Sequence, residues 1–153
     1  MADENRLNQS TAIHRRLKEL LSQQRYLLCA YLDVLEKQQC AIASGTEEAI
    51  LAYAEIEEKI AADMSSVQKT IVPLENLAAR YDSADSFSDL KAELEDLTCQ
   101  VAAWSQRNRD QLFSRMTDVR KKIELVRNSS LAIGSRRSLY QTAGIASFVN
   151  VQG

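Results

Sequence analysis

The stretch LEKQQCAIASGTEEAILAYAEIEEKI, residues 35–60, contains two apolar helical patterns separated by a single glycine. Gly45 suits the left-handed conformation in which many helices end, and Thr46 then offers an N-cap for a new helix. Glu47 and Glu48 follow in the first turn of that helix, where the positive end of the helix dipole favours acidic side chains. The stretch therefore predicts a helical hairpin.

Apolar residues recur at helical spacing on both sides of this turn. Leucines seven residues apart predict a helix over residues 11–43, and steps of three and four predict a second helix over residues 46–72. Pro73 lacks a backbone donor and clashes with the preceding helical turn, so we expect it to break or kink the second helix. Residues 74–81 form a short continuation in this prediction.

A third long helix is expected over residues 88–127. Its apolar stripe keeps a heptad from Leu90 to Trp104 and shifts after Asn108 by an inserted four-residue step, which locally unwinds a coiled coil. Gln24, Gln38 and Asn108 occupy stripe positions, where polar side chains either fix the register or mark where a bundle opens to a bound protein.

Three long helices with short connections predict an all-α fold, an elongated antiparallel bundle with a flexible or partner-ordered C-terminal tail. We assign residues 1–128 to the bundle domain and residues 129–153 to a recognition tail. The last sixteen residues, SLYQTAGIASFVNVQG, carry no charge but several large apolar side chains. Such a tail either packs on the bundle as a terminal cap or orders on a partner, and we favour the second interpretation.

The composition argues against several function classes. The chain has 153 residues, 19 Lys and Arg against 21 Asp and Glu, and a net charge of −2, unlike the basic balance of dedicated nucleic-acid-binding proteins. Its single histidine, His14, provides no Glu-x-x-His pair for di-iron, and three separated cysteines provide no zinc cluster. We expect a protein without enzymatic activity, metal or cofactor.

The sequence also predicts a cytoplasmic protein. Three dispersed cysteines fit reduced thiols, and the polar start MADENRLNQS lacks the apolar core of a signal peptide. No apolar run approaches the length of about 18 residues that a membrane span needs, so no stable membrane insertion is expected. The basic run Arg120-Lys121-Lys122 is interleaved with Asp118 and Glu124, as on ordinary solvated helix faces, and an anionic partner is the alternative interpretation.

Three stretches together resemble the FlgN family of flagellar type III export chaperones. The hairpin above has that family's glycine-containing turn before a second helix with a late lysine, Lys59. LEDLTCQVAAWSQRNRDQLFSRM, residues 94–116, resembles its leucine-rich run that leads to an asparagine, here Asn108. LYQTAG, residues 139–144, resembles its Leu-Tyr pair followed by a nearby glycine. The ending FVNVQG departs from the family by being more apolar.

The resemblance implies a chaperone that binds the helix-prone terminal segments of hook–filament junction proteins, its clients, and keeps them unpolymerised before export. It implies that clients bind the end of the third helix and the segment after it: Leu112, Met116, Val119, Ile123, Val126, Leu131 and Ile133. It also implies that Leu139, Tyr140 and Gly144 dock on the cytoplasmic domain of the export gate. Two alternatives are a structural coiled-coil adaptor unrelated to secretion and a type III secretion chaperone for another class of client.

Overall fold

The computed structural model consists of three helices: α1 (Ala2–Ser44), α2 (Glu47–Ala79) and α3 (Ser88–Val149). It describes residues 1–81 and 87–149, with side chains for 1–81 and 87–134. The described part of the chain contains no strand, so the predicted all-α class with three long helices is confirmed.

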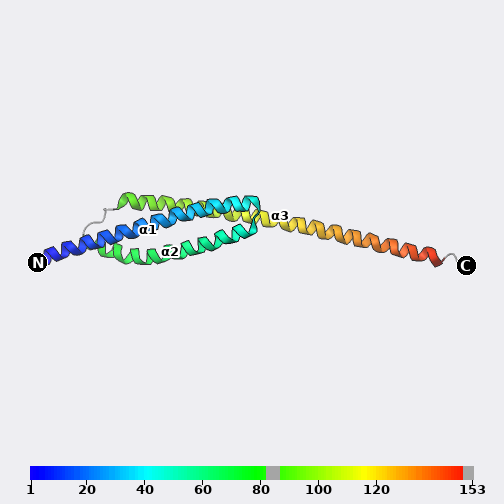
Figure 1. Ribbon diagram of the computed structural model, residues 1–153, viewed down its shortest axis with the longest axis horizontal. Coiled ribbons are helices and arrows are strands. Elements are labelled where there is room, and N and C mark those ends of the chain that lie inside the picture. The colour runs from blue at the N-terminus through cyan, green and yellow to red at the C-terminus, as the bar shows by residue number, and fades with distance from the viewer. Residues whose placement is uncertain (82–86, 150–153) are drawn as a thin grey trace. The chain divides into compact units, whose positions relative to one another are not determined.

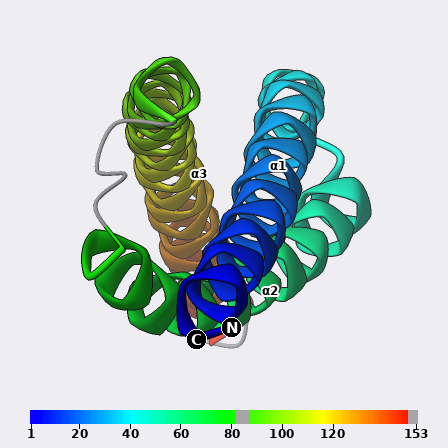
Figure 2. The same cartoon turned by 90° about the vertical axis from the view of Figure 1, so that its left-hand side faces the viewer.

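The chain divides into two compact units, Met1–Asp110 and Gln111–Gly153, and α3 contributes residues to both. In the first unit, α1, α2 and the beginning of α3 lie side by side, and α2 runs antiparallel to the other two (Figures 1 and 2). The boundary between the units precedes the boundary that we expected at residues 128 and 129. The division into a bundle and a recognition tail remains a prediction.

The turn between α1 and α2 confirms the hairpin. Gly45 has a φ of 75° and a ψ of 25°, the left-handed region that glycine adopts without steric cost. The Gly45 and Thr46 amides both donate to the carbonyl oxygen of Ala41, at 3.0 and 3.2 Å, and so satisfy the end of α1. Thr46 occupies the N-cap position of α2, but its hydroxyl lies 3.0 Å from the Ser44 hydroxyl and makes no capping hydrogen bond.

Of the two outcomes expected at Pro73, a break or a kink, the break does not occur, since α2 continues through the proline to Ala79. Most of the continuation expected over residues 74–81 is therefore part of this helix. Ile71 and Ala78 are buried on either side of the proline, and Leu74 packs against the same core. A proline inside a helix costs about 3 kcal/mol, and full burial of one large aliphatic side chain returns about 1.5–3 kcal/mol. Burial of this segment therefore offsets the lost backbone hydrogen bond.

The predicted end of the third helix at residue 127 is also wrong, since α3 continues to Val149. The residues that follow, Asn128, Ser129 and Ser130, include no proline. The Ser129 hydroxyl donates to the carbonyl oxygen of Leu125 at 2.8 Å, a bond that lets a serine remain in a helix. Polar residues that favour loops are thus accommodated here within the helix.

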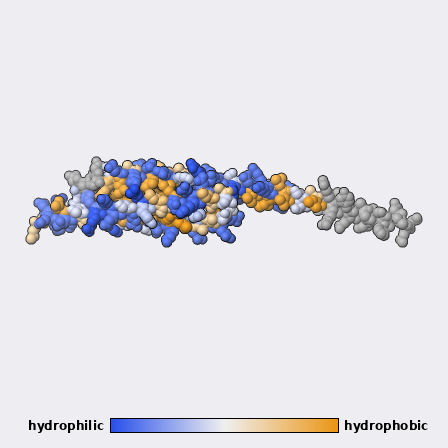
Figure 3. Space-filling model, turned by 45° about the horizontal axis from the view of Figure 1, so that its top comes forward, coloured by the Kyte–Doolittle hydropathy of each residue, from blue (hydrophilic) through white to orange (hydrophobic). Residues whose placement is uncertain are grey.

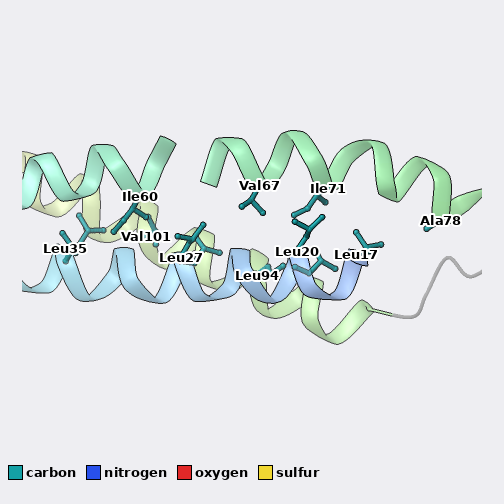
Figure 4. Packing of buried hydrophobic residues seen from close by; sticks show 13 residues of the cluster. Leu17, Leu20, Leu27, Leu35, Ile60, Val67, Ile71, Ala78, Leu94 and Val101 are labelled. Carbon is teal, nitrogen blue, oxygen red and sulfur yellow. The ribbon is translucent and has the colours of Figure 1, made fainter. Parts of the chain in front are cut away.

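All three helices contribute to the core of the first unit. Side chains from α1, α2 and α3 point toward one another in Figure 4, and Leu28 and Leu35 of α1 are fully buried. The core residues are Leu17, Leu20, Leu21, Leu27, Leu28, Val34, Leu35, Ile60, Val67, Ile71, Ala78, Leu94 and Val101. Trp104 packs against this cluster, as its stripe position predicted.

A buried polar contact joins α3 to α1 close to the end of the first unit. Asn108 is 3% exposed, and its Nδ2 donates to the Leu35 carbonyl oxygen at 2.8 Å and to Gln38 Oε1 at 2.9 Å. On α2, burial raises the pKa of Glu57, although a hydrogen bond with Gln38 and the charge of Arg109 oppose that shift. These contacts form at one alignment of the helices, which favours the interpretation that the polar positions fix the register.

Candidate partner-binding face

Large apolar residues follow a regular seam along α3 in the second unit. Steps of four and three connect successive members, the spacing with which a helix packs against a partner helix. Ser130 occupies one step of this seam, and the remaining positions are apolar. We define the second-unit stripe as Leu112, Met116, Val119, Ile123, Val126 and Ile133.

The second-unit stripe faces solvent for most of its length. Leu112 is half-buried, whereas the other five residues are between 48% and 66% exposed. In the first unit, by contrast, the stripe residues Leu94 and Val101 of the same helix are 7% and 9% exposed. Apolar atoms are visible on the surface of the described part of α3 in the second unit (Figure 3). The stripe therefore has the spacing of a helix that packs against another helix, but no described residue of the chain covers it.

A shallow, almost wholly apolar depression lies in the middle of the second-unit stripe. Its floor comes from Val119, Ile123 and Val126, and Lys122 and Arg127 border it. A depression lined by aliphatic side chains, with long basic residues beside it, is better suited to binding the apolar face of a helix than to binding a small polar ligand.

Charge is distributed unevenly between the two units. Residues 1–110 carry 12 Lys and Arg against 19 Asp and Glu, a net charge of −7. Residues 111–153 carry seven basic residues against two acidic ones, a net charge of +5. The overall charge of −2 therefore conceals an acidic bundle and a basic segment. A basic surface of this kind attracts acidic partners and increases their association rate.

The structure places the expected client-binding residues on one helix, and six of the seven lie on one face. Leu131 is exposed but falls outside the seam, on the side of the helix that carries Glu124. Phe113 and Leu125, which the sequence did not single out, are exposed as well. They do not belong to the periodic run of apolar residues in the sequence, so the periodicity did not identify them as exposed apolar residues.

The basic run Arg120-Lys121-Lys122 was recognised in the sequence, with an anionic partner as the alternative interpretation, but its position beside the seam was not. Counting the heptad outward from the apolar positions would have located it, because flanking positions are determined by sequence alone. The residues expected to dock on the export gate, Leu139, Tyr140 and Gly144, lie outside the residues whose side chains are described. Their role remains a prediction.

Other kinds of site find little support in the described residues. No group of three or more His, Cys, Asp or Glu side chains there is placed to hold a metal ion. Among the same residues, no helix is both long and apolar enough to cross a membrane. Cys29, Cys40 and Cys99 are exposed free thiols.

Comparison with known proteins identifies a relative in Treponema pallidum (strain Nichols), a protein described as uncharacterized. The two chains are 34% identical over 111 residues, which is 72% of each chain. The chain therefore belongs to the same family as this Treponema protein. No protein-family model and no solved structure matches the chain, and the resemblance to flagellar export chaperones remains a prediction.

Proposed function

We propose that this protein is a flagellar export chaperone that holds the helix-prone terminal segments of hook–filament junction proteins on the second-unit stripe. The observation that carries the proposal is the exposed seam. Five of its residues are about half exposed or more, although their spacing is that of a packing interface. Soluble monomeric proteins seldom expose extended apolar patches, and where such patches occur they commonly bind another protein.

The length of the stripe matches a client helix of several turns. From Leu112 to Ile133 the helix rises about 30 Å at 1.5 Å per residue. A client helix that awaits polymerisation exposes an apolar face of its own, and laying that face along the stripe removes both surfaces from water. Occupying the client's interface in this way keeps it from polymerising early.

The resemblance to the flagellar chaperones supports the choice of client and the delivery step. In this proposal Tyr140 and its neighbours then dock on the cytoplasmic domain of the export gate. A tyrosine suits this role because its ring fills a pocket while its hydroxyl still finds a hydrogen-bond partner. We place the protein in the cytoplasm, where clients await export.

Substitution of Ile123 tests client binding. Titration calorimetry would measure the binding of a junction protein from the same genome to the full-length chain. We expect about one-to-one binding by the native chain and its loss in Ile123→Asp, because a carboxylate would be buried against the client's apolar face. Leu125→Asp is the control, since Leu125 is similarly exposed but lies off the seam. Unchanged binding by Ile123→Asp would refute the proposal, and capture of proteins unrelated to export would favour the adaptor alternative.

Substitution of Tyr140 tests the delivery step separately. Tyr140→Ala should reduce export of the client while leaving its affinity and the thermal melt of the bundle nearly unchanged. Export at the native level, or melting several degrees lower, would contradict a docking role for Tyr140.

A further inference from the structure

In the first unit, two charged residues of α3, one on each side of its stripe, meet an opposite charge on another helix. Lys91 follows the stripe residue Leu90, and its Nζ lies 3.1 Å from Oε1 of Glu75 on α2. Glu93 precedes the stripe residue Leu94, and its Oε1 lies 2.8 Å from Nε of Arg25 on α1. In packed helices, residues at these flanking positions select the partner by charge.

In the second unit, every charged residue at the equivalent flanking positions is basic. Arg115 and Lys122 precede the stripe residues Met116 and Ile123, and Arg120 and Arg127 follow Val119 and Val126. Both acidic residues of this unit, Asp118 and Glu124, occupy heptad positions farther from the seam. Lys122 and Arg127 border the apolar depression directly, and no ion pair among the described residues involves either one.

This charge pattern disfavours a second copy of α3 as the occupant. In a parallel pair, the preceding position of one helix faces the following position of the other, and in an antiparallel pair like positions face each other. Both arrangements bring basic residues together on this stripe. Like charges across a helix pair are unfavourable, so the stripe does not match itself.

We infer that the second-unit stripe binds an amphipathic helix of another protein whose own apolar seam is bordered by Asp and Glu. The inference rests on the proposed function, that the stripe holds a client helix, and adds the chemistry by which that helix is selected. Aliphatic burial supplies the attraction, and the basic borders distinguish acidic-bordered helices from others.

Two synthetic four-heptad peptides test the inference. Both carry the same aliphatic seam, and the flanking positions are all Glu in one and all Lys in the other. Fluorescence anisotropy with the full-length chain at low salt should show about tenfold tighter binding of the Glu peptide. The ratio should approach one at high salt, because screening weakens interactions between exposed charges.

Neighbouring lysines provide matched variants. Lys122→Glu with Arg127→Glu should reverse the preference toward the Lys peptide. Lys121→Glu, on the opposite side of the helix from the seam, should change the ratio by less than Lys122→Glu alone.

The possible outcomes separate the two proposals. Equal binding of both peptides, abolished by Ile123→Asp, would overturn the charge inference and leave the helix-binding function standing. Binding of neither peptide would count against both proposals. A dimer of the chain alone that Ile123→Asp dissociates in sedimentation experiments would show that a second copy is the occupant, which also overturns the inference.

Discussion

The same helix behaves differently in the two units of the molecule. In the first unit, the seam of α3 includes Leu94 and Val101, both buried against α1 and α2. In the second unit, the seam keeps the same steps of four and three, yet Ile123 and Val126 are 60% and 66% exposed. The same amphipathic pattern is thus covered in one unit and exposed in the other, so the pattern alone does not say whether other helices of the chain bury it.

The charges beside the seam differ in a corresponding way. Lys91 and Glu93 of α3 have opposite signs and find opposite partners within the bundle. Lys122 and Arg127 have one sign, and the described part of the chain offers them no ion-pair partner. The flanking charges therefore differ between the part of α3 that packs against its own chain and the part that faces solvent.

The largest expected effect concerns seam residues themselves. Leu94→Ala should destabilise the protein by about 2–5 kcal/mol, because it leaves a cavity in the core. Ile123→Ala removes the same number of carbon atoms from the same helix and should cost less than about 0.5 kcal/mol. Urea denaturation followed by circular dichroism would measure both. A cost of several kcal/mol for Ile123→Ala would show that the second-unit stripe is covered within the chain.

A smaller effect is expected from the polar seam positions. Asn108→Leu should cost about 1–3 kcal/mol, because the Leu35 carbonyl and Gln38 Oε1 lose their donor while buried. Combining it with Gln38→Leu should recover part of the loss. Ser130→Leu is the matched change on the exposed seam and should leave stability unaltered. Equal unfolding midpoints for Asn108→Leu and the native protein would contradict a role in register.

The smallest effect should come from the flanking charges. Glu93→Lys replaces a pair with Arg25 by a repulsion, and should cost at most about 1 kcal/mol, since both side chains are about half exposed. Lys122→Glu should not reduce stability at all. The difference between the two variants should shrink at high salt. If Lys122→Glu destabilised the protein as much as Glu93→Lys, the flanking charges of both units would contribute equally to folding stability, which would contradict the expected difference.

Much of the fold could be predicted from residues alone. The glycine turn at Gly45 and the leucine spacing around it located α1 and α2, because local turn geometry and helical periodicity are encoded in short stretches. The break allowed for at Pro73 and the expected end of the third helix were wrong for a common reason. Each prediction gave a local helix-breaking preference more weight than the surrounding structure allowed, and burial of Ile71 and Ala78 outweighed the proline.

Residue order and helical periodicity are enough to locate the seam of α3 and its basic borders, because heptad positions follow from them. Which part of that seam is buried depends instead on how the helices of the first unit pack. Asn108 is the last seam residue buried against α1, and α1 ends soon afterwards at Ser44, where the chain turns into α2. Burial depends on how far the partner helices extend, which is a property of the whole hairpin and not of α3. Val101 is therefore a core residue of the first unit, whereas Val126 on the same helix is exposed in the second.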